Sequence, residues 1–387
     1  MKIAFFSNFL NHHQLPLCQG FINKEEIEFK FVACEKTPSD RMNMGYEDMN
    51  STYPFVVKAY ENKELAYQIA DEYDVVIWGA APMVYMENRI NANKITFRFC
   101  ERLLKKGMWR RFIPKTRRTI YNAYIKHRNK KFYVLGASAY TAWDLSICGF
   151  PKEKCFTWGY FPSVMEFDIE DLIKFKDNQK VEILYAGRLL KLKRVIDSVK
   201  AIEKLVKNQI TNIHFTIIGE GQEKNNLVKY IQKRKLTNYI DILPFKKPEE
   251  VRAFMNKANI YIFGSDFHEG WGAVVNEAMN SACVLLASHA VGSAPLLIKD
   301  GVNGYVYPCG NVKKLALILE SIVKNKEIRY QVGRKAYETI TKEWTAENAV
   351  KRLLMLIKRI QEGNDLFELY ESGPCSQAKL IKNNWVY

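Results

Sequence analysis

The sequence predicts an α/β protein with two domains, each a parallel sheet flanked by helices. The chain has 387 residues, more than one ordinary domain requires, and 48% of them are hydrophobic, enough for two cores. Short apolar runs alternate with helical stretches through both halves, which is typical of parallel sheets with crossover helices. A polar stretch over residues 166–180 separates the halves and is interpreted as a linker.

The first half contains six expected strands. They cover residues 2–8, 28–34, 74–79, 95–100, 131–137 and 155–161. Helices are expected between some of them, at residues 63–73 and 138–149.

The second half repeats the alternation. Its expected strands cover residues 181–187, 213–218, 240–244, 260–264, 284–288 and 304–307. A last helix is expected from Trp344 to Ile360, because Leu353, Leu356 and Ile357 form an apolar stripe with helical spacing.

The most informative stretch joins a strand, a glycine-rich turn and a helix. It begins at His268-Glu269, continues through Gly270-Trp271-Gly272 and contains Glu277 in the helical run. Such a unit directs backbone N–H groups and the positive end of a helix dipole toward an anion. Carboxylates on either side accept hydrogen bonds from hydroxyls, so a diphosphate between polyhydroxyl groups fits. The alternative is that both glutamates are solvated surface residues.

Two cations follow the first strand of the second half. Arg188 and Lys193 are expected at the carboxyl edge of the sheet, where open α/β sheets bind ligands. Cations at a helix start oppose the helix dipole, and an anion between them removes that objection. The pair therefore predicts diphosphate binding.

These motifs together resemble those of the retaining glycosyltransferases of family 4, over about residues 181–345. The matching segments are the two glutamates of E-x7-E at 269 and 277, G-R-x4-K from Gly187 to Lys193, G-x-G at 219–221 and D-G-x-N-G at 300–304. They occur in the family's order, which is more specific than any one of them.

The resemblance implies the GT-B fold, in which two Rossmann-like domains face each other across a cleft. Residues 1–170 would form the acceptor-binding domain, with a C-terminal helix at about 345–362 and the tail to 387 packing back on it. Residues 171–344 would form the nucleotide-sugar-binding domain. The implied reaction is retaining transfer of a hexosyl residue from a UDP- or GDP-sugar to a lipid-linked or cell-surface glycan acceptor.

The resemblance also implies roles for individual residues. Arg188, Lys193 and Glu269 would be catalytic, the cations stabilising charge on the departing diphosphate and Glu269 contacting donor-sugar hydroxyls. The implied donor-binding residues are Gly187, Gly219, Gly270, Trp271, Gly272, Ala273, Val274 and Glu277, the last at the ribose hydroxyls. No cofactor is expected. No metal is expected either, because the two cations would do the work of Mg²⁺ and no D-x-D segment occurs.

Four residues of the first half are candidates for acceptor binding. His12 and His13 follow the first strand, and Arg98 and Glu101 end the fourth. The histidines have the alternative of being solvated surface residues, and Glu101 that of an internal ion-pair partner.

The net charge of +16 is concentrated in residues 94–131, which contain fourteen Lys or Arg and one acid, Glu101. Trp109 and Phe112 are interleaved with these charges, which suits an anionic membrane surface or a polyprenyl-diphosphate-linked acceptor. We therefore expect a cytoplasmic protein, peripheral on the inner face of the cytoplasmic membrane. A solvated helical face is one alternative. Nucleic acid is another and is not expected, because no nucleic-acid-binding motif accompanies the charges.

The lack of recognisable targeting signals and the spacing of the cysteines also favour the cytoplasm. The sequence has no run of 18 apolar residues, and its N-terminus enters a strand at once, so neither a spanning helix nor a secretory signal is expected. The eight cysteines are scattered, which favours reduced thiols. Two further function classes stay open: a two-lobed nucleotide-binding protein without turnover, and a polyanion-binding protein that uses residues 94–131.

Overall fold

The chain divides into two compact units in the structure, a computed structural model that describes residues 1–39, 42, 47–364, 366 and 369–386. Unit 1 contains the described residues of 1–163 and 344–382. Unit 2 contains residues 164–343 and the last residues from 383 onward. Each unit is therefore assembled from segments that are distant in the sequence.

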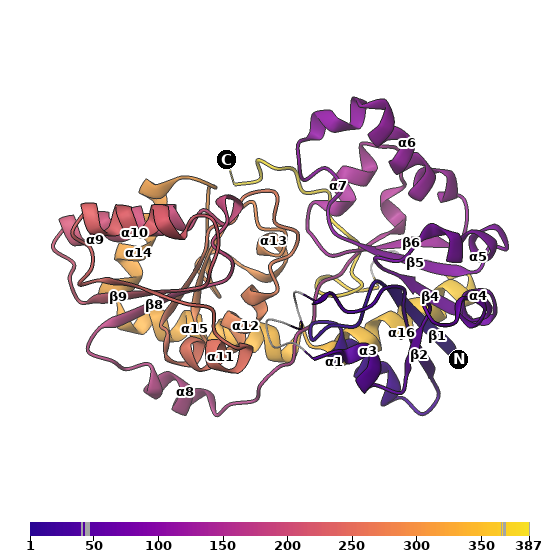
Figure 1. The fold of residues 1–387 in the computed structure, drawn as a ribbon, viewed down its shortest axis with the longest axis horizontal. Helices are drawn as coiled ribbons and strands as arrows, with labels where there is room; N and C mark the ends of the chain where they lie inside the picture. Colours follow the sequence, from indigo (N-terminus) through magenta and orange to yellow (C-terminus); the bar gives the residue numbers. More distant parts are fainter. Residues whose placement is uncertain (40–41, 43–46, 365, 367–368, 387) are drawn as a thin grey trace. The chain divides into compact units, whose positions relative to one another are not determined.

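Within the described residues, unit 1 has a seven-stranded parallel sheet in the order β3-β2-β1-β4-β5-β6-β7 (Figure 1). Its strands are β1 (Lys2–Ser7), β2 (Glu28–Ala33), β3 (Val56–Lys58), β4 (Val75–Trp78), β5 (Ile95–Cys100), β6 (Phe132–Gly136) and β7 (Cys155–Thr157). Its helices are α1 (Leu15–Ile22), α3 (Met49–Thr52), α4 (Lys63–Glu72), α5 (Glu87–Asn91), α6 (Pro114–Ala123), α7 (Thr141–Ser146) and α16 (Ala346–Glu362). Four 3₁₀ turns lie among them: η1 (Met83–Tyr85), η2 (Met108–Phe112), η3 (Ile125–His127) and η4 (Lys152–Lys154).

The last helix, α16, packs in unit 1 because one of its faces is apolar at helical spacing. Val350, Leu353 and Ile357 are buried on that face, and the helix lies against α1. The contact is close, since a Cβ on Gly20 of α1 would lie 3.1 Å from the Val350 side chain. Trp344 is buried just before the helix begins.

Within the described residues, unit 2 has a six-stranded parallel sheet in the order β10-β9-β8-β11-β12-β13. Its strands are β8 (Val181–Ala186), β9 (Ile213–Ile218), β10 (Ile240–Leu243), β11 (Ile260–Phe263), β12 (Val284–Ser288) and β13 (Tyr305–Tyr307). Its helices are α8 (Ile169–Phe175), α9 (Val195–Lys207), α10 (Lys224–Lys233), α11 (Pro248–Lys257), α12 (Val274–Asn280), α13 (Ala294–Leu297), α14 (Val312–Lys324) and α15 (Lys326–Lys342), with a 3₁₀ turn η5 (Lys191–Lys193).

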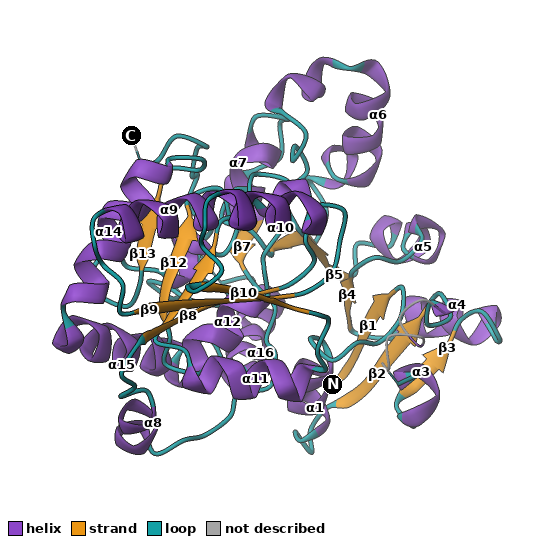
Figure 2. Cartoon of the chain, turned by 60° about the vertical axis from the view of Figure 1, so that its left-hand side comes forward, coloured by secondary structure: helices purple, strands orange, loops and turns teal. Residues whose placement is uncertain are grey.

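Helices cover both faces of the unit 2 sheet. Figures 1 and 2 show α9, α10 and α14 on one face and α11, α12 and α15 on the other. Strands covered on both faces consist of continuous apolar runs, as in β11 and β12, where every residue is buried.

The strand order of unit 2 reverses between β8 and β11. The chain runs from β8 outward to β10, then returns to β11 on the other side of β8. The loops that follow β8 and β11 therefore leave the sheet side by side at its carboxyl edge. In open α/β sheets this point of reversal is where ligands bind. Unit 1 has the same arrangement between β1 and β4.

The expected strands agree with the observed ones to within a residue or two, apart from the one that contains β7, and the structure has one strand that was not expected. β7 ends at Thr157, so the expectation of a strand to residue 161 is wrong. β3, a three-residue edge strand, was not expected at all. The helix expected over 138–149 is shorter, since α7 covers only Thr141–Ser146.

The expected linker over residues 166–180 is wrong, because this stretch contains α8. Asp168 caps the helix by accepting hydrogen bonds from the N–H groups of Glu170 and Asp171. Leu172 and Ile173 are buried where α8 packs on α15. Its buried and partly buried apolar residues Ile169, Leu172 and Ile173 span little more than one turn among charges, which is too short a signal for periodicity. The burial that stabilises this helix is tertiary.

Candidate donor site in unit 2 and acceptor site in unit 1

The loops after β8 and β11 are joined at the carboxyl edge of the unit 2 sheet. Lys193 donates a hydrogen bond from Nζ to Oε2 of Glu269, and both side chains are only 14% exposed. The N–H of Asp266 donates to the carbonyl of Leu192 at 2.8 Å. Lys193 Nζ also lies 5.0 Å from the centroid of the Phe263 ring. The structure thus brings together two of the expected catalytic residues at the point of strand reversal.

Arg188 lies on the β8 loop, as Lys193 does, and it is exposed. Its carbonyl accepts a hydrogen bond from the hydroxyl of Tyr185 at 3.0 Å. Burial raises the pKa of Tyr185, the charge of Glu269 raises it further, and the charge of Arg188 lowers it. Arg188 and Glu269 therefore both lie within electrostatic range of one buried phenol, although no direct bond joins them in the described residues.

At three of the expected donor-site glycines, the backbone conformation or a close neighbour leaves no room for a side chain. Gly187 and Gly219 adopt φ of +153° and +147°, and a Cβ on Gly219 would overlap the carbonyl oxygen of Gly187. The ends of β8 and β9 therefore approach each other directly at this edge. Gly272 adopts φ of +83°, and a Cβ there would lie 2.5 Å from the Phe263 ring.

Trp271 is a core residue whose indole cannot contact a ligand. Its ring is 1% exposed, and Nε1 donates to Oδ1 of Asn276 at 2.8 Å. Its carbonyl accepts a hydrogen bond from Ser293 Oγ at 2.7 Å. Any contact from this residue to a donor would come from its backbone N–H. Gly270 is buried beside it, and Ala273 and Val274, at the start of α12, are partly exposed.

Glu277 is the fourth residue of α12 and is partly buried. Burial raises the pKa of its carboxyl group, and the nearby charge of Arg252 opposes that effect. Arg252, on α11, donates from Nη1 to the main-chain carbonyl of Glu277 at 2.9 Å. The sequence did not single out Arg252, because only the packing of α11 on α12 brings it to this site.

The acceptor candidates gather at the carboxyl edge of the unit 1 sheet. The rings of His12 and His13 lie 3.8 Å apart, and the ring of His13 lies 6.4 Å from that of Tyr160. The Tyr160 hydroxyl donates to Oε1 of Glu101 at 3.3 Å, and Lys105 Nζ donates to Oε2. Glu101 therefore forms an ion pair with Lys105, and its carboxylate keeps further lone pairs for other donors. Tyr160 was missed because it fell inside an expected strand.

Arg98 is held by the backbone of the neighbouring strand. Its Nη1 donates to the carbonyl of Trp78 at 3.1 Å and to that of Gly79, and its guanidinium lies 4.0 Å from the centroid of the Trp78 ring. These contacts join the ends of β4 and β5.

The basic segment, residues 94–131, turns some cations inward and leaves others exposed. Arg102 is fully buried in an ion pair with Asp144 at 3.0 Å, and Asp144 also accepts the N–H of Leu104 at 2.8 Å. Trp109 and Phe112 on η2 are 62% and 72% exposed. The exposed cations of this segment are Lys106, Lys115, Arg117, Arg118, Lys126, Arg128 and Lys131.

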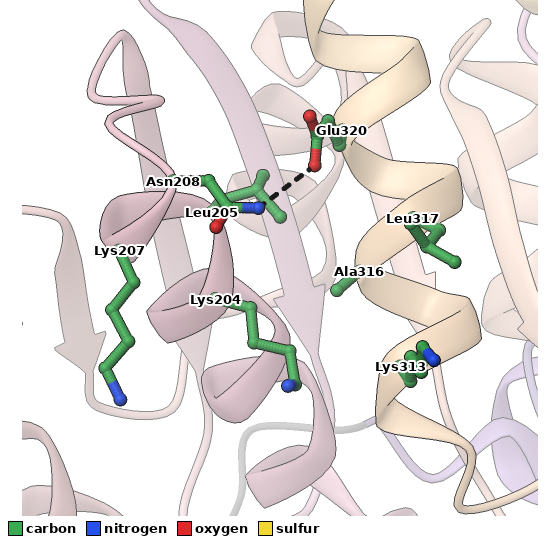
Figure 3. A pocket seen from close by; sticks show the side chains of 8 residues that line it. All are labelled: Lys204, Leu205, Lys207, Asn208, Lys313, Ala316, Leu317 and Glu320. Carbon is green, nitrogen blue, oxygen red and sulfur yellow. Dashed lines mark hydrogen bonds between the residues drawn. The ribbon is translucent and has the colours of Figure 1, made fainter.

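A second group of lysines lines a hollow on the outer faces of α9 and α14 (Figure 3). Lys204, Lys207 and Lys313 border it, and Asn208 donates to Oε2 of Glu320 across it at 3.3 Å. This hollow lies on the helices, whereas Lys193 and Glu269 lie at the strand ends, so it is separate from the candidate donor site.

Some features are absent from the described part of the chain. None of its helices is long and apolar enough to cross a membrane. Across the same residues, no three His, Cys, Asp or Glu side chains gather as a metal site. All eight cysteines lie in this part and none forms a disulfide.

Comparison with known proteins gives a family match for most of unit 2. Residues 167–339 match the family "Glycosyl transferases group 1". The matched residues include both the β8 and β11 loops. The matched range contains the four motifs singled out in the sequence.

The curated relatives are glycosyltransferases. A poly(glycerol-phosphate) alpha-glucosyltransferase of Bacillus subtilis is 25% identical over 48% of this chain and 27% of its own length. The amylovoran biosynthesis glycosyltransferase AmsK of Erwinia amylovora is 25% identical over 55% of this chain and 52% of its own. An N-acetyl-D-galactosaminyltransferase of Campylobacter jejuni, which acts on an undecaprenol-diphosphate-linked glycan, is 28% identical over 49% and 52%. The chain spans at most about half the length of these relatives.

Solved structures resemble the whole chain. HepE of Anabaena in complex with UDP has a TM-score of 0.66 and 15% identity, covering 94% of this chain and 99% of that one. A glycosyltransferase of Rickettsia africae has a TM-score of 0.67 and 15% identity, with the same coverage. The two Rossmann-like parallel sheets match these neighbours, and the expected GT-B fold is confirmed.

Proposed function

We propose that the protein is a retaining glycosyltransferase that moves a hexosyl residue from a UDP- or GDP-sugar to a lipid-linked or cell-surface glycan acceptor, without a metal. The observation that supports this best is the Lys193–Glu269 ion pair at the point of strand reversal. The group 1 domain match supports sugar transfer, and the names of the curated relatives support a glycan acceptor. A bound UDP in the Anabaena neighbour supports a nucleotide-linked donor.

The cations act on the leaving group. As the glycosidic bond of the donor lengthens, negative charge builds on the diphosphate, and Arg188 and Lys193 stabilise that charge more in the transition state than before it. In the structure, Lys193 forms an ion pair with Glu269. With the donor bound, Lys193 turns to the diphosphate, which frees Glu269 to accept hydrogen bonds from sugar hydroxyls.

The other proposed contacts follow from the same arrangement. Glu277 accepts hydrogen bonds from the ribose hydroxyls, and Arg252 balances its charge. Gly187, Gly219, and residues 270–274 contact the diphosphate and sugar through their backbones, because their glycines leave no side chain in the way.

The acceptor belongs with unit 1 in this proposal. His12, His13 and Glu101 offer ring nitrogens and carboxylate oxygens to acceptor hydroxyls at the carboxyl edge of the sheet. Arg98 fixes the strand ends that present them.

Substitution of the donor-site residues tests the proposal. Arg188→Ala and Glu269→Ala are assayed with a panel of UDP- and GDP-sugars for release of nucleotide and free or transferred sugar. Loss of a charge-assisted hydrogen bond of roughly 1.5–3 kcal/mol predicts a rate about 10- to 100-fold lower. Lys326→Ala is the control, because Lys326, on α15, forms an exposed ion pair with Asp177, and its loss leaves the edge of the sheet intact.

Two outcomes contradict the assignment in different ways. Full activity in both variants would falsify the assigned site. Nucleotide binding by calorimetry without any turnover would instead favour a two-lobed binding protein of the same fold.

We further propose that the protein is cytoplasmic and binds the inner face of the cytoplasmic membrane through the basic segment. Trp109 and Phe112 project from η2 among exposed cations, and Tyr121 on α6 is also exposed. Aromatic rings enter the interface of a bilayer, and each cation near an anionic surface contributes about 1 kcal/mol. The same cations suit the phosphates of a polyprenyl-diphosphate-linked acceptor.

Vesicle sedimentation tests this surface. Replacing Lys106, Arg110 and Arg111 with Gln, together with Trp109→Ala, is expected to abolish association with vesicles containing anionic lipid. The matched control replaces Lys204, Lys207 and Lys313, the lysines of the α9–α14 hollow, with Gln and retains association. Equal sedimentation of both variants with vesicles would contradict the membrane role, and retention of RNA at moderate salt without vesicle binding would favour a nucleic-acid partner instead.

A further inference from the structure

A carboxylate–imidazole pair lies in the loop after β11, directly before Glu269. Oδ1 of Asp266 accepts two hydrogen bonds from His268, one from its backbone N–H and one from ring Nδ1, each at 2.9 Å. The side chain of His268 is 51% exposed, which is more than that of Asp266. His268 opens the motif stretch described in the sequence analysis and Asp266 lies just before it, but no role was assigned to either residue.

Asp266 positions the loop as well as the imidazole. Its N–H donates to the carbonyl of Leu192, next to Lys193, and its own carbonyl accepts the N–H of Glu269 at 3.0 Å. One residue thus orients His268, holds the peptide of Glu269 and joins the β11 loop to the β8 loop. The imidazole is therefore fixed at the same edge as the Lys193–Glu269 pair.

The hydrogen bonds decide which ring nitrogen can act. A carboxylate only accepts hydrogen bonds, so Nδ1 bears the proton and the lone pair of the neutral ring is on Nε2. Within the described part of the chain, Nε2 has no hydrogen-bond partner. A fixed Nε2 with its lone pair exposed is suited to accept the proton of a hydroxyl.

The charges around this ring come from both loops. Asp266 and Glu269 are the acids on its own loop, and Lys193 and Arg194 are the cations on the β8 loop. Lys193 is paired with Glu269, and Arg194 with Asp197 at 2.7 Å. Asp266 is thus the carboxylate that contacts the imidazole directly.

We propose that His268, held by Asp266, is the general base that takes the proton from the attacking hydroxyl. This inference rests on the proposed glycosyl transfer. The oxygen of the hydroxyl forms a bond to the anomeric carbon on the face from which the diphosphate departs, so that the configuration is retained. The bond from that carbon to the diphosphate oxygen breaks, and its electron pair leaves with the diphosphate. The hydroxyl proton moves to Nε2, and the Asp266 carboxylate stabilises the imidazolium. His268 is the catalytic residue and Asp266 the positioning residue.

The test uses the full chain and water as the attacking hydroxyl. Hydrolysis of UDP-glucose, UDP-N-acetylglucosamine, UDP-galactose and GDP-mannose is measured for wild type, His268→Gln and Asp266→Asn between pH 5 and 9 (roughly the range over which imidazole changes charge). General-base catalysis is typically worth about 10²- to 10⁴-fold, so His268→Gln is expected to lower kcat by about 100-fold or more. Asp266→Asn, which keeps the ring but weakens its orientation, is expected to lower kcat by a smaller factor.

Two readouts separate catalysis from a structural role. The fall in wild-type kcat at acidic pH is expected to disappear in His268→Gln, and the Kd for UDP is expected to stay within a few-fold of wild type. His214→Gln is the matched control, because His214 lies on β9 between Glu182 and Asp241 and its substitution is expected to leave kcat unchanged.

Three other results would each overturn either the general base or the glycosyl transfer itself. A kcat for His268→Gln close to wild type at every pH overturns the general base and leaves the proposed function standing. A loss of UDP affinity as large as the loss of kcat also overturns it, by assigning His268 to donor binding. If wild type turns over none of the four donors while UDP binds, glycosyl transfer itself fails, and the general base with it.

Discussion

The Lys193–Glu269 ion pair is less exposed to solvent than the Lys326–Asp177 ion pair of unit 2. At 14% exposure each, Lys193 and Glu269 have lost most of their water, whereas Lys326 and Asp177 are more than half exposed. An exposed pair contributes only about 0–1 kcal/mol to stability. A largely buried pair loses hydration that its attraction does not always offset, so its presence at a strand-reversal point suggests a functional reason for keeping it.

Gly272 gives a residue-scale prediction, because its φ of +83° and its contact with Phe263 both exclude a side chain. Gly272→Ala is expected to cost about 1–2 kcal/mol for the left-handed backbone and about 1–3 kcal/mol more for displacing the Phe263 ring, which also lies beneath Lys193. Denaturant unfolding and the hydrolysis assay measure the two consequences: lower stability and lower rate.

Gly301→Ala is the matched control for that substitution. Its φ of +73° imposes a similar backbone cost, but a Cβ there meets no atom within 4 Å. Gly301→Ala is expected to lose only the stability that the left-handed backbone costs and to keep full activity. Equal losses of stability in the two variants would show that the Phe263 contact contributes nothing.

At the scale of elements, three neighbouring strands of unit 2 share a polar cluster. His214 on β9 contacts Glu182 on β8 through Nδ1 at 2.9 Å and Asp241 on β10 through Nε2 at 3.0 Å. The hydrogen bond with Glu182 is the main cause that raises the pKa of His214, partial burial opposes it, and Asp241 raises it further. Each of the three is the second residue of its strand, so the cluster lies at the amino edge of the sheet, away from the candidate donor site.

This cluster predicts a pH dependence of stability. Because the folded pKa of His214 lies above its ordinary value of 6.5, the protonated ring contributes stability that is fully present below that value. The contribution is lost as the pH rises through the folded pKa. Melting temperatures measured across this interval are expected to fall more for wild type than for His214→Gln. Parallel curves for the two proteins would contradict the prediction.

At the scale of the whole molecule, each unit is completed by residues from the far end of the chain. The helix α16 belongs to unit 1, and the residues from 383 onward belong to unit 2. There the ring Nε2 of His289 donates to the carbonyl of Asn383 at 3.0 Å, while Nδ1 accepts the N–H of Cys309 at 2.9 Å. Burial lowers the pKa of His289, in keeping with this neutral form. Neither unit is therefore complete without residues that follow position 343.

Donor binding to unit 2 predicts an unequal response of the two units to nucleotide. A ligand at 100 times its Kd stabilises the state it binds by about 2.7 kcal/mol. For a domain of this size each kcal/mol raises the melting temperature by roughly 2–4 °C. In calorimetry with UDP or GDP, the transition of unit 2 is therefore expected to rise by roughly 5–10 °C. Arg188→Ala is expected to reduce the rise, and an unchanged rise in that variant would contradict its assigned contact.

The parallel sheets and the loop residues were readable from the sequence because their signals are local. Buried strands such as β11 and β12 are continuous apolar runs, and Arg188, Lys193 and Glu269 lie in the loops that follow β8 and β11. The order of elements along the chain then determines that these residues leave the sheet at its carboxyl edge.

The succession of elements, the motifs and the excess of positive charge can all be read from the order of amino acids alone. Which partners meet depends on how the chain folds. Folding buried Trp271 and Arg102, tied Arg98 to the β4 backbone, brought Arg252 to Glu277, and turned an expected linker into α8. These outcomes depend on contacts between residues far apart in the chain. Spacing and composition describe only neighbours in sequence, so they contain no record of such contacts.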